Sequence, residues 1–263
     1  MSLAISGHTA HVTLCHTGKF NAMSRAMWRE LRAVFEGLQK NNPGTVRCVV
    51  LQGAEGHFCA GGDISEYADF RFQEASLRDF HENEVWGGLQ AMLDCDVPMV
   101  ASIDGNCMGA GLEMASCCDL RLAATSARFG APIARLGFPM APREAALVAR
   151  AVGEMTAREM LLSAAVLDAA EMKQRGFLNR VCEPSALAGA VRDLSERIGS
   201  LAPAAARQNK QTFRSNQPLA HALLSGHAID SVANFTTDAY RYANSAEHRE
   251  GVTAFNDKRA PVF

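Results

Sequence analysis

Two glycine-rich segments could present backbone N–H groups to a ligand. The first is VLQGAEGHFCAGGD, residues 50–63, and the second is SIDGNCMGAGLE, residues 102–113. Glycines let a ligand come close to main-chain N–H groups. The first N–H groups of a helix also lack internal partners and carry partial positive charge. Together the two segments suit the stabilisation of an oxyanion.

Acidic side chains lie beside these glycines. Glu113 follows Ala110 by three residues and falls in the first turn of the predicted helix. It could transfer a proton, or it could simply match the positive end of the helix. Asp63 can cap the next helix, with Glu66 at the spacing of a capping box. His57 could act at the same place, although a loop histidine is more often a surface residue.

The elements that must position these residues alternate between strands and helices. Strands are predicted at residues 8–16, 47–52, 99–103 and 119–123. A helix is expected after Ser24, another over 76–93, and mostly helix from about 185 onward. A turn is predicted at 41–44, and capping boxes at 156–159 and 168–171. This order predicts an α/β fold with parallel crossovers and a helical appendage.

The composition excludes several classes of protein. The chain has 263 residues, 48% of them hydrophobic, and a formal net charge of -2. Such a chain has no basic field for nucleic acid or for a membrane surface, so an anionic ligand would need a local site. The eight cysteines contain no CxxC pair and indicate reduced core thiols rather than a metal site. No leader or spanning segment is recognisable, so we expect a cytoplasmic protein.

Taken together, the two segments resemble the signature regions of the crotonase (enoyl-CoA hydratase/isomerase) superfamily. The matching residues are FCAGGD at 58–63, Gly105, GAGLE at 109–113 and Asp119. The resemblance extends over essentially the whole chain. Further matches are KFNAM at 19–23, ARFG at 127–130, Leu136-Gly137, GFLNRV at 176–181 and FNDKRAPVF at 255–263.

The resemblance implies a spiral of ββα units over residues 1–200 and a helical oligomerisation region over 201–263. It implies an acyl-CoA thioester as substrate, as in fatty acid metabolism, and a homotrimer or a dimer of trimers. Coenzyme A would be part of the substrate, and no cofactor or metal would be needed. The backbone N–H groups of Gly62 and Ala110 would form the oxyanion hole, and Glu113 would be an acid/base group.

The resemblance also implies a set of substrate contacts. One part would hold the coenzyme A, and the other would line the acyl site. The implied residues are Asn21, Ala22, Met23, Cys59, Ala60, Asp63, Ile64, Ile133, Phe138, Met140 and Lys258. Lys258 and Arg259 are also consistent with two ordinary solvent-exposed charges that bind no ligand.

Three positions depart from the family pattern. Enoyl-CoA hydratases carry a second glutamate where this chain has Ile133, and some relatives place an acid near the position of Ala141. Both residues are apolar here, and the tyrosine of the decarboxylase branch is replaced near Met140. Glu144 is the nearest remaining acid, and we interpret it as an ordinary helix-start glutamate. Isomerisation, hydrolysis, decarboxylation and silent acyl-CoA binding therefore stay open beside hydration.

Overall fold

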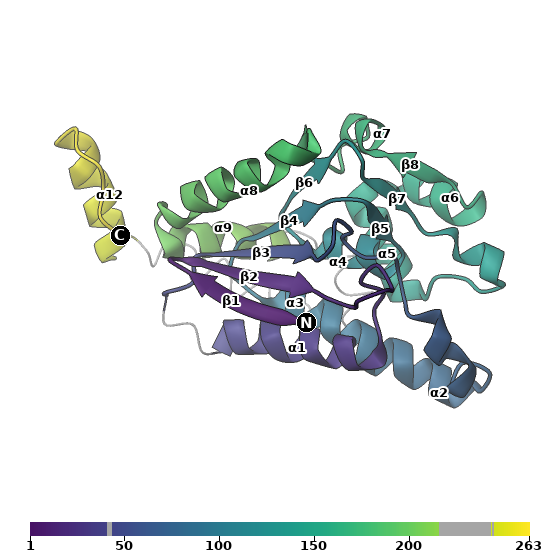
Figure 1. Cartoon of the computed structure of the whole chain (residues 1–263). Helices are drawn as coiled ribbons and strands as arrows, with labels where there is room; N and C mark the ends of the chain where they lie inside the picture. Colours follow the sequence, from purple (N-terminus) through teal and green to yellow (C-terminus); the bar gives the residue numbers. More distant parts are fainter. Residues whose placement is uncertain (41–43, 216–242, 244) are drawn as a thin grey trace.

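A six-stranded sheet forms the centre of the protein in the computed structural model, which describes residues 1–40, 44–215, 243 and 245–263. Its strand order is β1-β2-β3-β4-β6-β9 (Figure 1). The strands are β1 (Ser2–Ser6), β2 (Thr9–Leu14), β3 (Cys48–Gly53), β4 (Met99–Ile103), β6 (Leu120–Ala124) and β9 (Arg180–Cys182). β1 and β2 pair antiparallel, and the other neighbours pair parallel, as the alternation of strands and helices predicts.

A second, three-stranded sheet has the order β5-β7-β8. It contains β5 (Asn106–Met108), β7 (Arg128–Gly130) and β8 (Val166–Asp168). The chain passes from the main sheet to this sheet and then into a helix, first as β4, β5 and α4 (Ala110–Cys117). It repeats the path with β6, β7, the 3₁₀ helix η3 (Pro132–Leu136) and α5 (Pro142–Val152). This repetition is the spiral of ββα units that the sequence predicts.

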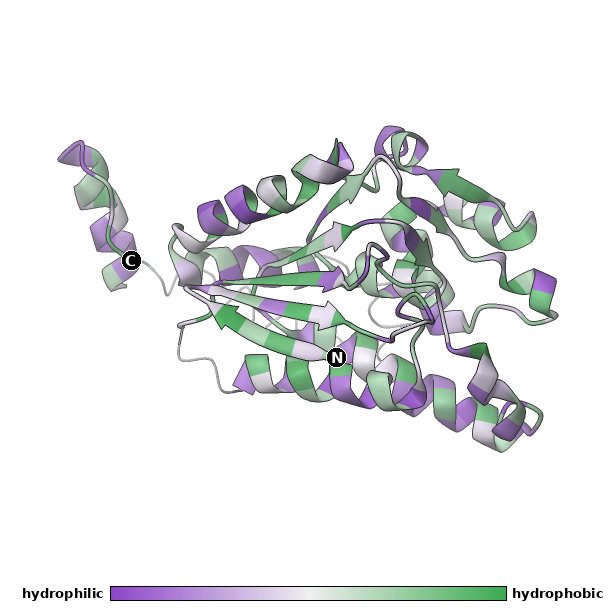
Figure 2. Cartoon of the chain, in the orientation of Figure 1, coloured by the Kyte–Doolittle hydropathy of each residue, from purple (hydrophilic) through white to green (hydrophobic). Residues whose placement is uncertain are grey.

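The central strands β3 and β4 are buried on both faces, which explains their continuous apolar runs, whereas the edge strand β1 is exposed. In β3, Val49 and Leu51 belong to the larger core, whereas Cys48 and Val50 belong to a smaller one. Helix α8 (Pro184–Gly199) covers the smaller core and packs against the strands. Figure 2 shows hydrophobic residues along the strands and mixed stretches along the covering helices.

The segment after the first glycine-rich loop differs from its prediction. A single helix is expected over 76–93, but three helical segments of two types follow one another there. They are α2 (Glu74–Asp79), a π-helical stretch η2 (Phe80–Val85) and α3 (Trp86–Asp94). A 3₁₀ helix η1 (Ile64–Asp69) precedes them, capped by the Asp63 side chain, which accepts from the Ser65 N–H. Glu66 does not complete the capping box, because its carboxylate accepts from the Arg25 N–H instead.

The other helix starts are mostly as expected. Ser24 caps α1 (Arg25–Lys40) by accepting from the Met27 N–H, and Asp168 forms a full capping box on α7 (Ala169–Gln174). The capping box predicted at 156–159 is wrong, because Thr156 is buried inside α6 (Glu154–Leu162).

The C-terminal part is described in two helices, α9 (Pro203–Ser215) and α12 (Ala246–Asn256). In Figure 1 α12 projects from the end of the main body. The predicted turn at 41–44 lies largely outside the described residues, as does the middle of the predicted oligomerisation region. The domain division at residue 200 therefore stays a prediction. Within the described residues, no helix combines the length and apolarity needed to cross a membrane.

Candidate active site

The two glycine-rich segments lie side by side. The Cys59 N–H donates to the Asn106 carbonyl over 2.8 Å, and the Met108 N–H donates to the Cys59 carbonyl over 2.9 Å. These hydrogen bonds form an isolated parallel β-bridge between the backbones of Cys59 and Cys107. A Cβ placed on Gly109 would lie 3.7 Å from the Gly61 Cα. The bends that carry the two predicted oxyanion donors therefore meet at one place.

A third segment, around Asn21, fixes the first bend from behind. The Met23 N–H donates to the Gly61 carbonyl and the Asp63 N–H donates to the Met23 carbonyl, each over 2.8 Å. The buried Asn21 amide donates to two carbonyls of the 54–57 turn over 2.8 and 2.7 Å. Asn21 itself has φ of 61°, a conformation that asparagine tolerates better than most residues. This network orients Gly62.

Both predicted donors border a cavity of about 300 Å³. Among the described residues, no backbone acceptor takes the N–H of Gly62 or the N–H of Ala110. Ala110 is the first residue of α4, so its N–H has no partner within the helix. Gly109 before it has φ of 46° and turns the chain from β5 into the helix. Two free N–H groups beside one cavity can hold a carbonyl oxygen as it gains charge.

Glu113 projects into the same cavity from the first turn of α4. Its side chain is buried, with 8% of its surface exposed. Burial raises the pKa of the Glu113 carboxyl well above its ordinary value, and the nearby Glu144 raises it further. A raised pKa favours the protonated form of the carboxyl group, which can act as a general acid.

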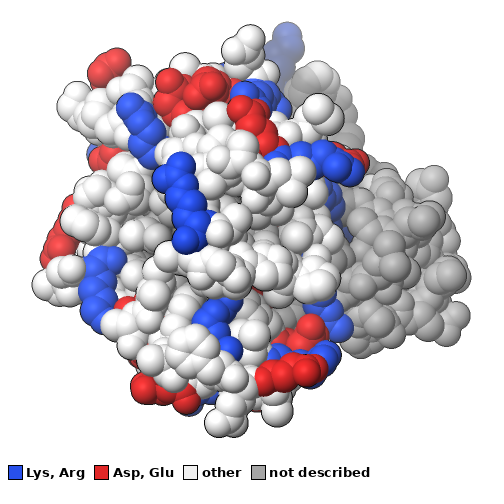
Figure 3. All heavy atoms as spheres, turned by 90° about the vertical axis from the view of Figure 1, so that its right-hand side faces the viewer, with Lys and Arg blue, Asp and Glu red and all other residues white. Residues whose placement is uncertain are grey.

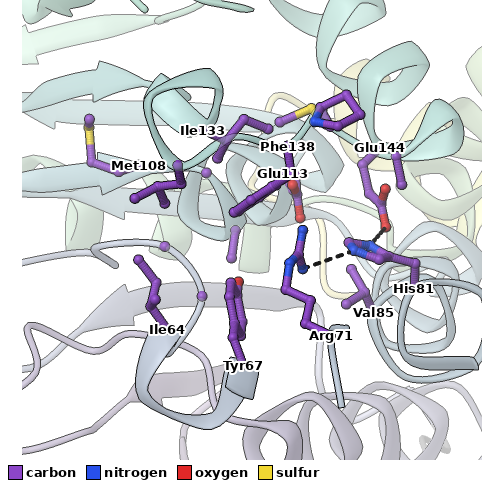
Figure 4. Close-up of a pocket in the computed structure, with 18 of the residues that line it drawn as sticks. Ile64, Tyr67, Arg71, His81, Val85, Met108, Glu113, Ile133, Phe138 and Glu144 are labelled. Carbon is purple, nitrogen blue, oxygen red and sulfur yellow. Dashed lines mark hydrogen bonds and ion pairs between the residues drawn. The ribbon is translucent and has the colours of Figure 1, made fainter. Parts of the chain in front are cut away.

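Glu144 is a second carboxyl group of the cavity, which corrects its interpretation as an ordinary helix-start residue. It lies in the first turn of α5, yet only 2% of its side chain is exposed. One oxygen, Oε1, lies 3.1 Å from Nδ1 of His81. The other, Oε2, is buried and has no hydrogen-bond partner among the described residues. Figure 4 shows Glu113 and Glu144 entering the cavity from different helices.

An aromatic and cationic wall faces these carboxyl groups, and the sequence predicts only Phe138 of it as a contact residue. The Arg71 guanidinium lies 3.7 Å from the Phe138 ring centre and 4.5 Å from the Tyr67 ring centre. Its NH1 atom is 3.4 Å from Nε2 of His81, a contact that Figure 4 marks. Burial lowers the pKa of Arg71. His81 is thus part of the cavity.

The predicted contact residues fall into two groups. Some line the cavity: Ala60, Ile64, Ile133, Phe138 and Met140. Others lie behind it or beside the bend: Asn21, Ala22, Met23, Cys59 and Asp63. Burial alone would raise the pKa of Asp63, but hydrogen bonds from Lys19 and Ser65 outweigh it and hold that pKa below its ordinary value.

Two predicted or considered residues lie apart from the cavity. Lys258 is exposed beyond the end of α12 and does not line it. The His57 ring accepts from the Asn106 N–H over 3.2 Å, taken with Nδ1 unprotonated, and packs edge-on against Phe20. His57 therefore supports the turn before β5 and does not line the cavity. The binding roles of all these residues stay predictions.

Among the described residues, no broad basic patch gathers at the carboxyl ends of the strands (Figure 3). Figure 3 shows Lys and Arg side chains dispersed over this face among acidic and uncharged residues. An anionic ligand would therefore be held by local contacts, as the net charge suggests.

Comparison with known proteins now decides the family. A sequence profile described as enoyl-CoA hydratase/isomerase matches residues 5–263. The chain belongs to the enoyl-CoA hydratase/isomerase family. This confirms the crotonase resemblance, and it identifies the chain as an enzyme of the lyase or isomerase type.

Relatives within the hydratase/isomerase family cover the chain almost completely. The chain is 30% identical to an (E)-benzylidenesuccinyl-CoA hydratase of Thauera aromatica, over 100% of this chain and 98% of the relative. It is also 30% identical to a short-chain-enoyl-CoA hydratase of Clostridium acetobutylicum, over 96% and 93%. An enoyl-CoA hydratase/carnithine racemase structure from Magnetospirillum magneticum superimposes with a TM-score of 0.89 at 32% identity. That match covers 99% of this chain and 94% of the other.

Proposed function

We propose that this enzyme hydrates a 2-enoyl-CoA thioester through an enolate. The N–H groups of Gly62 and Ala110 bind the thioester oxygen, and Glu113 transfers the proton at the α-carbon. The observation that carries this proposal is the meeting of two free N–H donors beside a buried carboxyl group. The names of several relatives, which are hydratases, support the choice of hydration.

The physical basis is electrostatic. The thioester oxygen gains negative charge when the enolate forms, and donors already in place stabilise that charge without rearranging. One such donor is worth about 10²–10³ in rate. The apolar cavity raises the value of each interaction because little water competes there. Its residues, among them Trp28, Phe80 and Val85, suit a short or medium apolar acyl chain.

The test is hydration of a panel of 2-enoyl-CoA thioesters, starting with crotonyl-CoA, by the wild type and by Glu113→Gln. We expect turnover by the wild type and a loss of about 10²–10⁴ in the variant. Tight thioester binding without turnover would identify a silent binding protein. Conversion of a thioester by isomerisation, hydrolysis or decarboxylation without hydration would replace the assignment by that reaction. Failure to bind any thioester would reject the proposal altogether.

Three further parts of the proposal concern the setting of the enzyme. The chemistry uses no cofactor beyond the coenzyme A of the substrate. Assembly into a homotrimer, or a dimer of trimers, is to be measured by light scattering on the full chain. A cytoplasmic location is to be checked by cell fractionation.

A further inference from the structure

We propose that Glu144, held by His81 and Arg71, is the second proton-transfer group of this active site. It would take the part that the family pattern gives to a glutamate at the position of Ile133. The inference rests on the proposed function, since it assigns a residue to the same hydration. It places the second carboxyl group on α5 instead of after Pro132.

The first support is the burial and aim of the Glu144 carboxyl group. It lines the cavity, and its charge reaches Glu113 strongly enough to raise the pKa of that residue. A buried polar atom without a partner destabilises the folded protein. Glu144 Oε2 is such an atom among the described residues. A group kept at that cost inside a cavity fits a partner that arrives with the reaction.

The second support is a chain of contacts that fixes the state of His81. An arginine N–H can only donate, so the His81 Nε2, 3.4 Å away, must accept. Nδ1 of the neutral ring then carries the proton and donates to Glu144 Oε1 over 3.1 Å. This arrangement leaves Oε2 as the oxygen that can take a proton.

The third support is the local structure that brings His81 inward. His81 lies in the π-helical stretch η2, directly after the buried Phe80. A π-helical turn accommodates an extra residue and shifts the side chains that follow it, and such turns are common at functional sites. Here the stretch places Phe80 in the core, and it places His81 between Arg71 and Glu144.

These groups give a balanced hydration step. The Glu144 carboxylate removes a proton from a water molecule, whose oxygen forms the new bond to the β-carbon. The electron pair of the C=C bond moves into the enolate, whose oxygen is bound by Gly62 and Ala110. Protonated Glu113 then gives its proton to the α-carbon as the thioester carbonyl re-forms. One water is added in total, and proton exchange through solvent returns both carboxyl groups to their starting states.

The main test separates the two carboxyl groups by two assays. Hydration needs both groups, whereas exchange of the α-protons of butyryl-CoA in D₂O needs only Glu113 and the oxyanion donors. For Glu144→Gln we expect hydration to fall by about 10²–10⁴ and exchange to fall by less than about tenfold. Glu154→Gln, at an exposed glutamate of α6, is the matched control and should behave as the wild type.

A rescue variant gives a readout that a merely structural role would not move. Adding Ile133→Glu to Glu144→Gln returns a carboxyl group to the cavity wall from the family position. We expect hydration to recover by about tenfold or more over Glu144→Gln alone.

The positioning role of His81 has its own test. His81→Asn keeps a donor near the place of Nδ1, whereas His81→Leu does not. We expect His81→Leu to lose more hydration than His81→Asn, because only asparagine can still donate a hydrogen bond to Glu144.

The outcomes distinguish the inference from the proposed function. No α-proton exchange and no hydration by the wild type would overturn the proposed function. Exchange and hydration by the wild type, with hydration kept by Glu144→Gln, would overturn only the role of Glu144. An equal loss of both activities in a folded Glu144→Gln, without rescue by Ile133→Glu, would reduce Glu144 to a structural residue and also overturn the inference.

Discussion

Substitution of Gly62 by alanine tests the oxyanion hole through one methyl group. The backbone of Gly62 lies outside the positive-φ region, so alanine adds no backbone strain there. A Cβ at this position would lie 2.2 Å from the Tyr67 hydroxyl oxygen and 3.2 Å from its Cζ. The ring cannot easily move away, because it packs against Phe70 and Phe138 and lies under the Arg71 guanidinium. The bend that carries the Gly62 N–H must therefore shift.

The magnitude follows from the loss of one donor. We expect kcat for hydration to fall by about 10²–10³, which corresponds to about 2.7–4 kcal/mol of lost stabilisation of the transition state. Tyr67→Phe removes the atom at 2.2 Å and leaves only the contact at 3.2 Å. The double variant Gly62→Ala with Tyr67→Phe should therefore recover about tenfold or more over Gly62→Ala alone.

The assay is steady-state hydration by the two single variants and the double variant. Gly37→Ala on α1, where a Cβ meets open space, is the matched control and should keep the wild-type rate. A Gly62→Ala enzyme within about threefold of the wild type would refute the reasoning. A double variant no faster than Gly62→Ala would show that the Tyr67 hydroxyl is not the cause.

Three other predictions concern stability. The folded-state pKa of Glu113 lies above the unfolded value of 4.5. The protonated carboxyl group therefore contributes stability below pH 4.5, and this contribution is lost as the pH rises from 4.5 through the folded-state pKa. The Tm of Glu113→Gln relative to that of the wild type should therefore increase between pH 4.5 and pH 8. Asp168→Ala removes a capping box and should lower the free energy of unfolding by about 1 kcal/mol, measured by urea titration. Gly111→Ala would place a Cβ 2.7 Å from the Cys59 carbonyl oxygen and should cost about 1–3 kcal/mol in the same titration; an unchanged midpoint in either titration would contradict the corresponding account.

Much of the fold follows from local signals in the sequence. The strand predicted at 99–103 is β4 without a shift, and Ser24 begins α1 as its hydroxyl predicts. These signals succeed because apolar runs and caps act within a few residues. The π-helical stretch within the helix over 76–93 carries no such signal. It packs against α1, a tertiary contact that local propensity does not contain.

The candidate site divides in the same way. The family resemblance of the two glycine-rich segments predicts Gly62 and Ala110 as oxyanion donors and Glu113 as an acid/base group, and all three line one cavity. Glu144 is visible in the sequence as the nearest remaining acid, but a glutamate at a helix start is common, so the sequence favours an ordinary helix-start residue. One signal could have corrected this: Glu144 shares a stripe at i, i+3, i+4 and i+8 with Leu147, Val148 and Val152, the buried face of α5. Arg71 and His81 required the tertiary structure.

The backbone β-bridge between Cys59 and Cys107 makes one side of the cavity different from the other. The loops that would receive the thioester oxygen form one side, and main-chain hydrogen bonds join them to each other. The opposite side consists of packed side chains, Tyr67, Arg71 and Phe138, which contact one another through their rings and the guanidinium and not through main-chain hydrogen bonds. Substitution of these side chains would change the space for the acyl tail, while the loops that receive the reacting carbonyl keep their place. Selectivity for the tail could therefore drift in evolution without disturbing the chemistry.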